Sequence, residues 1–283
     1  DQVNPLTTDA FIFGTSDTPV ITGTEGHDLL TGSAVPDNLL GLGGDDRLEG
    51  LGGGDLLNGG DGVDTAVYAS SATGVTVDLL TGTGSGGDAA RDKLVSIENI
   101  EGSSHNDVFI ANSVANHLNG GDGNDTADYS DTSEGVTVDL GTGSATGEAG
   151  NDTLDSIENV TGGDGDDILI GDENANILDG GAGNDTVYGN DGDDTLIGGE
   201  GDDTLSYEGA EDGVSVDLAN GTATGGAGND VIDGFETVIG SDHADTVRGN
   251  ADANRFFGSP GGDSMDGRGG TDTADYSGST QGV

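Results

Sequence analysis

Residues 162–206 read GGDGDDILI GDENANILD GGAGNDTVY GNDGDDTLI GGEGDDTLS, which are five consecutive segments of nine residues. The segments share the template G-G-x-G-x-D-x-U-x, in which U is a large apolar residue. A short repeat with a fixed period predicts a solenoid, because each unit can bury its apolar side only by stacking on its neighbours. The U position holds Leu169, Leu178, Val187, Leu196 and Leu205.

The same nine-residue frame recurs along most of the chain. Its first six residues form a glycine-rich turn, and its last three alternate outward, inward and outward like a short strand. Two such units make one coil of 18 residues, so every second turn lies on the same edge. We therefore predict an all-β fold, a parallel β-roll or β-solenoid. Further copies begin at Gly23, Gly41, Gly59, Gly120, Gly147, Gly225 and Gly267.

The turns place aspartates at intervals of one coil, as at Asp167, Asp185 and Asp203. Stacked coils lie about 4.8 Å apart, and like charges at that spacing repel by roughly 1 kcal/mol in water. The net charge is −49, and six Lys and Arg residues cannot neutralise it. A divalent cation between stacked carboxylates would turn this repulsion into attraction. Oxygen ligands without His or Cys favour Ca²⁺, with Mg²⁺ second because Mg²⁺ demands stricter octahedral geometry.

The glycine frame and the aspartate register resemble the RTX, or hemolysin-type, calcium-binding repeat family. The resemblance covers most of the chain from about Gly23 onward. It implies a right-handed parallel β-roll with rows of calcium ions along the turn edges. It also implies type I secretion from a Gram-negative bacterium, in which the polypeptide crosses the envelope unfolded and folds in the calcium outside.

Spacing and resemblance together define a set of candidate calcium ligands. The carboxylates are Asp28, Asp46, Asp55, Asp64, Asp125, Asp152, Asp167, Asp185, Asp194, Asp203, Asp230, Asp263 and Asp272. The backbone carbonyls are those of Gly60, Gly62, Gly121, Gly123, Gly163, Gly165, Gly181, Gly183, Gly199, Gly201, Gly226 and Gly228. Weaker binding or none is expected at Asp107 and Asp245, where His105 and His243 replace a turn glycine, and at the turns that carry Asn116, Asn176 and Asn254.

A longer repeat interrupts the nonapeptides. It begins at Tyr68, Tyr129 and Tyr207, contains GVTVDL or GVSVDL, and continues into SIENI, SIENV or GFETV. We interpret it as coils that lack the full calcium turn, with Val75, Val77 and Leu79 directed toward the core. The tyrosines are expected to pack over the first strand of each unit, and sugar-stacking platforms are the less favoured alternative.

A fourth copy of the longer repeat starts at Tyr276 and reaches only Val283, so we expect the protein to continue beyond it. The predicted organisation is an N-terminal lead-in or cap at residues 1–22 and a continuous solenoid at residues 23–283. Cysteine is absent, which excludes disulfides and thiolate metal sites. Nucleic acid is an unsuitable partner for so acidic a chain, and no apolar run is long enough to span a bilayer.

Motifs of catalysis are missing from the sequence: it has no H-E-x-x-H and no G-x-S-x-G. We therefore expect a non-enzymatic, secreted structural module of a large surface protein, such as an adhesin, an S-layer protein or a filament subunit. Its expected partners are Ca²⁺, copies of itself and cell-surface components. The alternative is the C-terminal secretion and folding region of an exported protease, lipase or polysaccharide epimerase. Ice binding is not favoured, because acidic residues occupy most of the turn positions that would need threonine.

Overall fold

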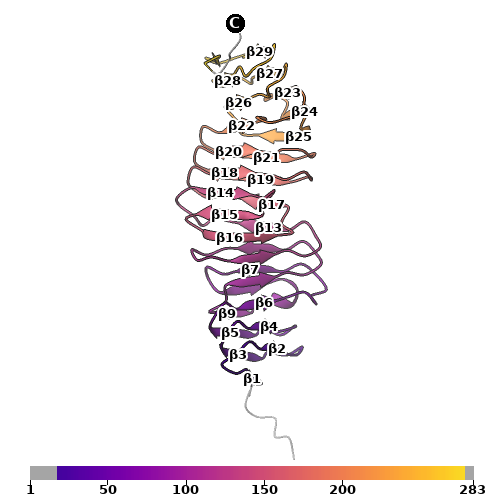
Figure 1. Ribbon diagram of the computed structural model, residues 1–283, viewed down its shortest axis with the longest axis vertical. Coiled ribbons are helices and arrows are strands. Elements are labelled where there is room, and N and C mark those ends of the chain that lie inside the picture. The colour runs from indigo at the N-terminus through magenta and orange to yellow at the C-terminus, as the bar shows by residue number, and fades with distance from the viewer. Residues whose placement is uncertain (1–17, 278–283) are drawn as a thin grey trace, which may run out of the picture.

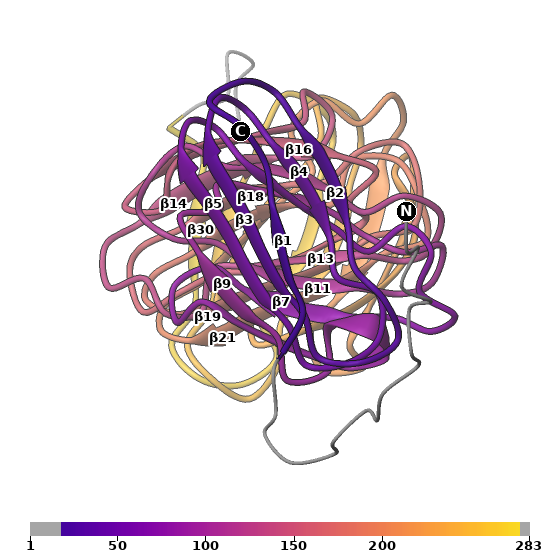
Figure 2. The same cartoon turned by 90° about the horizontal axis from the view of Figure 1, so that it is seen from below.

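Two long β-sheets make up the computed structural model, which describes residues 18–277. The strands lie across the long axis of the molecule and follow one another from the N-terminal end to the C-terminal end (Figure 1). A view from below shows successive coils lying over one another (Figure 2). This arrangement confirms the predicted all-β solenoid.

The first sheet has 16 strands and the second has 14. In spatial order the first sheet contains β1 (Val20–Thr22), β3 (Asn38–Gly43), β5 (Leu56–Asp61), β9 (Lys93–Val95), β8 (Thr83–Ser85), β7 (Thr76–Asp78), β11 (Val108–Ile110), β13 (Thr126–Asp128), β17 (Asn159–Thr161), β19 (Ile177–Ala182), β21 (Thr195–Glu200), β25 (Gly228–Asp233), β24 (Thr222–Gly225), β23 (Val214–Asp217), β27 (Thr246–Arg248) and β29 (Ser264–Asp266). The second contains β2 (Leu29–Thr31), β4 (Arg47–Glu49), β6 (Thr65–Val67), β10 (Asn99–Glu101), β12 (His117–Asn119), β16 (Gly150–Asp155), β15 (Ser144–Gly147), β14 (Val136–Asp139), β18 (Ile168–Ile170), β20 (Thr186–Tyr188), β22 (Thr204–Ser206), β26 (Thr237–Ile239), β28 (Arg255–Phe257) and β30 (Thr273–Asp275). A 3₁₀ turn, η1, covers Gly87–Ala89.

The coil length is 18 residues wherever nonapeptides follow one another. Parallel pairing joins Leu39 to Leu57 in the first sheet and Leu169 to Val187 in the second. Consecutive nonapeptides thus contribute alternately to the two sheets, and the turns between them form two edges. We call the turns that precede strands of the first sheet the first edge, and those that precede strands of the second sheet the second edge.

The core lies between the two sheets and consists of the middle residue of each short strand. Leu178, Leu196 and Leu205 are fully buried there. Strand geometry explains the pattern, since successive side chains point to opposite faces and only the central one of three faces inward. Each buried leucine contributes roughly 1.5–3 kcal/mol. Val75, Val77 and Leu79 are also buried, which confirms their predicted orientation.

Each copy of the longer repeat inserts a reversed strand into a sheet. In the second copy β15 pairs antiparallel with both β14 and β16, while β14 pairs in parallel with β18. The first and third copies do the same with β8 and β24. The interpretation as plain coils without a calcium turn was therefore incomplete, because these units also carry an antiparallel excursion. Residue alternation predicted the strands but not their direction.

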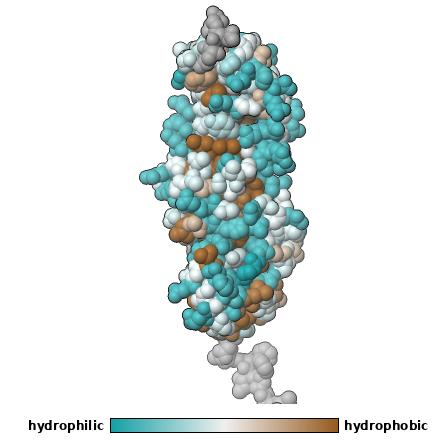
Figure 3. All heavy atoms as spheres, viewed as in Figure 1, coloured by the Kyte–Doolittle hydropathy of each residue, from teal (hydrophilic) through white to brown (hydrophobic). Residues whose placement is uncertain are grey.

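Hydrophilic residues dominate the surface, and the exposed apolar side chains are scattered among them (Figure 3). Among the residues described, no helix is long and apolar enough to cross a membrane. The segment predicted as a lead-in contributes β1, which pairs with β3 in the same 18-residue register. Residues 1–17 and 278–283 lie outside the described residues, so the domain boundary at Gly23 and the truncated final repeat stay predictions.

Candidate metal-binding turns

The turn aspartates form a ladder of hydrogen bonds along each edge. We number the six turn residues 1 to 6, so that the aspartate occupies position 6. Its Oδ1 accepts the backbone N–H of the position-6 residue one coil earlier; Asp185 accepts from Asp167 and Asp203 from Asp185, both at 2.8 Å. This bond orients each carboxylate inward, so Asp185 and Asp203 are almost fully buried. One oxygen of each carboxylate is therefore occupied by a hydrogen bond from the backbone.

In one group of turns the second carboxylate oxygen, Oδ2, is buried and has no hydrogen-bond partner. We call these open turns. Leaving a buried carboxylate oxygen without a donor costs several kcal/mol unless a cation or water supplies the missing interaction. The open turns end at Asp46, Asp55, Asp64, Asp125, Asp185, Asp194 and Asp203.

The open turns also share one backbone conformation. In every open turn, position 2 has a left-handed φ between 62° and 112°. Glycine adopts that conformation without strain, but Leu42, Leu51 and Asn190 adopt it as well. Left-handed leucine costs roughly 1–2 kcal/mol, so the surrounding structure must hold these turns in place. Arg268, four residues before the exposed Asp272, has the same conformation.

In the second group, which we call closed turns, position 2 is not left-handed. Its N–H points inward and donates to the side-chain oxygen of position 6, as from Gly163 to Asp167 at 2.7 Å. Ser33 donates to Asp37 with both its N–H and its Oγ. A donor from the chain itself therefore stands where a cation would otherwise be needed. The closed turns end at Asp28, Asp37, Asp107, Asn116, Asp167, Asn176 and Asn254.

The carbonyls of positions 2 and 4 point toward the next coil in open and closed turns alike. A Cβ on Gly199 or Gly201 would overlap the carbonyls of Gly181 and Gly183 in an open turn, and a Cβ on Gly181 or Gly183 would overlap those of Gly163 and Gly165 in a closed turn. Eight of the predicted carbonyls lie in open turns: Gly60, Gly62, Gly121, Gly123, Gly181, Gly183, Gly199 and Gly201. Gly163 and Gly165 lie in a closed turn, where the Gly163 carbonyl accepts the N–H of Ala182.

Burial raises the pKa of ladder aspartates in open turns and outside them, as at Asp152, where the pKa is about 6, and at Asp167. Burial raises the pKa of Asp125, Asp185 and Asp194 to about 7 each, and neighbouring carboxylates add to the shift. Burial also raises the pKa of Asp64 and Asp203. Such carboxylates are costly to ionise without a positive partner. A bound divalent cation would supply that partner.

Two copies of the nonapeptide template form a stacked turn only in their second half, where a Cβ on Gly150 or Gly228 would overlap the carbonyl of Val114 or Gly192 in the coil below. Gly147–Gly150 and Gly225–Gly228 are tight hairpins between antiparallel strands. Asp152 and Asp230 therefore lie in β16 and β25, with Oδ1 accepting a backbone N–H. The hairpin replaces the first half of the predicted turn at both places. Gly226 and Gly228 belong to the second hairpin, and calcium binding by these glycines, Asp152 and Asp230 stays a prediction.

The tyrosines of the longer repeat donate hydrogen bonds to the second carboxylate oxygen of these aspartates. The Tyr207 hydroxyl donates to Asp230 Oδ2 at 2.7 Å, and Tyr129 donates to Asp152 at 3.2 Å. Both tyrosines are at most 3% exposed, which confirms the packing role. Tyr68 donates to Asp92 in the same way at 3.1 Å. A hydroxyl group thus satisfies the carboxylate that a cation would satisfy in an open turn.

Side chains also satisfy polar groups at two of the asparagine turns and at both histidine turns, whereas the buried Nδ2 of Asn254 has no hydrogen-bond partner. The Nδ2 groups of Asn116 and Asn176 donate to the carbonyls of Glu98 and Glu158, each at 2.8 Å. At those two turns an amide nitrogen, which donates a hydrogen bond, stands where an open turn has the unpaired Oδ2. Asp107 accepts from Ser103, and Asp245 from Ser241. Asp263 is half-buried and accepts the N–H of Asp245.

Sequence reasoning missed four acidic residues of the two ladders. Asp92 is buried and accepts the N–H of Asp55. Glu98, Glu158 and Glu236 lie in the SIEN and GFET segments of the longer repeat and accept the N–H of Asp64, Asp125 and Asp203. The signal for the glutamates was their recurrence at one position of the longer repeat.

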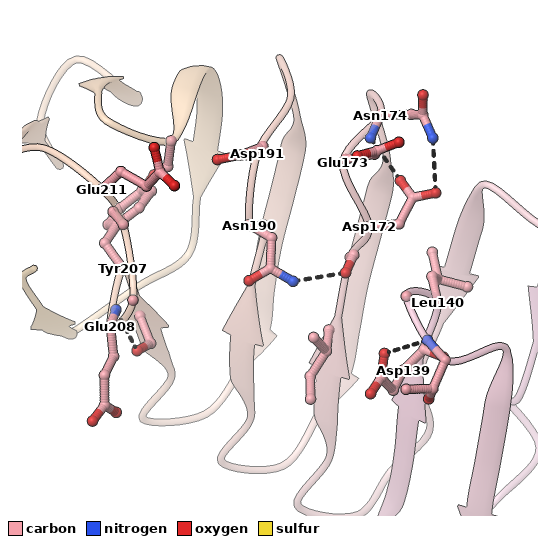
Figure 4. Close-up of a pocket in the computed structure, with 18 residues that line it drawn as sticks. Asp139, Leu140, Asp172, Glu173, Asn174, Asn190, Asp191, Tyr207, Glu208 and Glu211 are labelled. Atoms are coloured by element: carbon pink, nitrogen blue, oxygen red, sulfur yellow. Dashed lines mark hydrogen bonds between the residues drawn. The ribbon is translucent and has the colours of Figure 1, made fainter.

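An acidic groove of about 660 Å³ opens beside the first edge, between the turns at residues 171–176 and 189–194 and the segments at residues 139–142 and 207–211 (Figure 4). Its lining includes Asp172, Glu173, Asp191 and Glu211 and no basic residue. The side chain of Asn190 bridges to the Gly171 carbonyl at 2.7 Å. The groove holds no histidine and shows no arrangement of a nucleophile with a base.

The donor set of the open turns fits calcium. Within residues 18–277, no three His, Asp or Glu side chains converge on one point. An open turn instead combines one buried carboxylate oxygen with backbone carbonyls of stacked coils. Calcium accepts such mixed oxygen ligands, six to eight in number, in flexible geometry.

Comparison with known families agrees with this chemistry. The model of the RTX calcium-binding nonapeptide repeat (four copies) matches residues 35–66, 101–131, 155–187, 170–205, 218–236 and 239–274, which together cover more than half of the chain. The chain therefore belongs to the RTX calcium-binding repeat family, whose repeats bind several calcium ions per array. No curated protein matches the sequence significantly.

Proposed function

We propose that this chain is the calcium-folded structural body of a large secreted bacterial surface protein, such as an adhesin, an S-layer protein or a filament subunit. Its membership of the RTX family makes it a calcium-binding repeat module, and such repeats are typical of secreted bacterial proteins. The elongated array in Figure 1 supports a structural role. The described turns contribute calcium ligands, and their side chains form no catalytic arrangement.

One observation carries the calcium-coupled folding in this proposal: within residues 18–277, seven buried aspartate oxygens have no donor. A chain with a net charge of −49 and six basic residues cannot neutralise these groups internally. Calcium that binds the folded chain alone stabilises it in proportion to the logarithm of the calcium concentration. The open turns therefore couple folding to calcium.

This coupling gives the chain a compartment switch. Extracellular calcium modules bind at about 10⁻⁴–10⁻³ M, which is far above cytosolic free calcium. The chain is expanded inside the cell, where it can pass through an export channel, and folds after it reaches external calcium. Folding outside also opposes movement back through the channel.

Circular dichroism and small-angle scattering with and without calcium test the proposal. Calcium should convert a coil spectrum to a β-sheet spectrum and contract the chain, and EGTA should reverse both changes. A chelated sample that remains as compact and as heat-resistant as the calcium-loaded one would contradict calcium-coupled folding. For the surface role, antibodies against the chain should label intact source cells, and labelling that requires permeabilised cells would contradict it.

A further inference from the structure

We infer that Glu98, Glu158 and Glu236 are calcium ligands that complete a two-carboxylate site at the end of the three rows of open turns that finish at Asp64, Asp125 and Asp203. The inference rests on the proposed calcium binding and adds ligands that the nonapeptide template does not contain. Each glutamate follows the last open turn before a longer repeat, so the pairs are Asp64 with Glu98, Asp125 with Glu158, and Asp203 with Glu236.

The backbone at these row ends differs from an ordinary coil. Three residues, Ser156 to Glu158, connect β16 to β17, whereas a nonapeptide has a six-residue turn. The short connection therefore lacks the position-2 and position-4 carbonyls that an ordinary upper turn presents. Ser96, Ser156 and Gly234 begin the three connections, and all of them have a left-handed φ, between 48° and 76°.

One carbonyl of the ordinary site is preserved. In an ordinary open turn, Oδ2 of Asp46 and the Gly59 carbonyl of the next coil lie on the same side of Gly41, where a Cβ would overlap both. At the row end, Oδ2 of Asp125 and the Ser156 carbonyl occupy the same positions around Gly120. The left-handed residue thus presents a carbonyl to the unpaired aspartate oxygen.

The glutamate supplies the remaining oxygens. Oε2 of Glu158 accepts the Asp125 N–H at 2.8 Å, which fixes the carboxylate beside Asp125. Asp125 is fully buried, and its Oδ2 has no partner. Two carboxylates held together without a counter-ion repel each other. A carboxylate can replace the missing carbonyls as a mono- or bidentate calcium ligand.

The alternative role for these glutamates is a hydrogen-bonding cap that binds no metal. Substitution by glutamine separates the two roles, because glutamine keeps an oxygen to accept the Asp125 N–H but has no charge. The Asp125 site suits the test, since Asp107, one coil earlier on the same edge, lies in a closed turn. Glu158→Gln therefore affects a single open turn.

The experiment measures calcium stoichiometry and affinity of the full chain by equilibrium dialysis and titration calorimetry. We expect Glu158→Gln to lose one bound ion or to weaken one site by about tenfold or more. Glu211→Gln removes the same charge from an exposed loop and should behave like the unmodified chain. Asp125→Asn should remove the same ion, and the double variant should lose no second ion, because neighbouring ligands of one site are not additive.

Glu98→Gln and Glu236→Gln repeat the test at the other row ends, and circular dichroism in saturating calcium confirms that each variant folds. Unchanged stoichiometry and affinity in the folded glutamine variants would overturn the inference and leave these residues as caps. An unmodified chain that binds no calcium would instead overturn the proposed function itself. The two failures are thus distinguishable.

Discussion

The turns at residues 162–167 and 180–185 both match the template, yet their structures differ. In the second turn Gly181 is left-handed and Asp185 Oδ2 has no partner. In the first turn the Gly163 N–H donates to Asp167. The neighbouring coil explains the difference: Gly163 lies against Thr132 of the longer repeat, whereas Gly181 lies against the Gly163 carbonyl. A turn that matches the template is open only where the coil below it also has a six-residue turn.

Calcium removal should give the largest effect and separate the two kinds of region. As calcium is withdrawn stepwise, we expect the open turns at residues 59–64 and 180–203 to lose their amide protection first, because their buried carboxylates lose their counter-charge. Closed turns and tyrosine-linked hairpins should lose protection only at lower calcium, before the whole chain becomes coil. Hydrogen exchange over a series of calcium concentrations measures this difference, and simultaneous loss along the whole chain at one concentration would contradict it.

In the absence of calcium, acidification should partly replace the metal. Asp125, Asp185 and Asp194 have pKa values of about 7 in the folded chain, above the ordinary value of 3.8. The folded state therefore binds more protons than the unfolded state between about pH 4 and pH 7, so its stability falls as the pH rises through that range. Chain stripped of calcium at neutral pH and then measured in calcium-free buffer should be more folded by circular dichroism at pH 5 than at pH 8. A calcium-free chain more stable at pH 8 would contradict the assignment.

Replacing Asp185 should weaken calcium binding, whereas replacing Asp167 should not. Asp185→Ala removes a ligand, and we expect binding at that site to weaken by about tenfold or more, or about 1.4 kcal/mol. Asp167→Ala should leave the number of bound ions unchanged and lower stability through the loss of its hydrogen bonds to Gly163 and Val136. Calorimetry distinguishes the two outcomes. Equal loss of calcium in both variants would show that closed turns bind metal too.

The tyrosine-linked hairpins should be stabilised independently of calcium. Tyr207→Phe leaves Asp230 Oδ2 without its donor, and we expect a loss of about 1 kcal/mol in the free energy of unfolding with no change in calcium stoichiometry. Tyr188→Phe is the matched control, because Tyr188 is only half-buried in β20. If Tyr207→Phe acquired an additional ion, the hydroxyl would be shown to occupy a latent metal site.

Much of the candidate site follows from local pattern. The nine-residue period predicted the two edges, and aspartate spacing predicted which carboxylates stack; Asp46, Asp64, Asp185 and Asp203 all lie in open turns. Weaker calcium binding was also predicted at Asn116 and Asn176, where each amide group donates to a backbone carbonyl. The template did not predict the hairpins at Gly147 and Gly225, which form because the preceding strand runs antiparallel beside the strand that follows.

The sequence by itself determined the repeat, the inward apolar residues, the acidic edges and hence the need for a divalent cation. Tertiary structure decided which turns are open, which aspartates meet a tyrosine hydroxyl, and where a glutamate ends a row. The physical reason is that each site is shared between two coils. One turn can present a carboxylate, but the coil stacked on it decides whether a backbone N–H, a hydroxyl group or a cation completes that carboxylate.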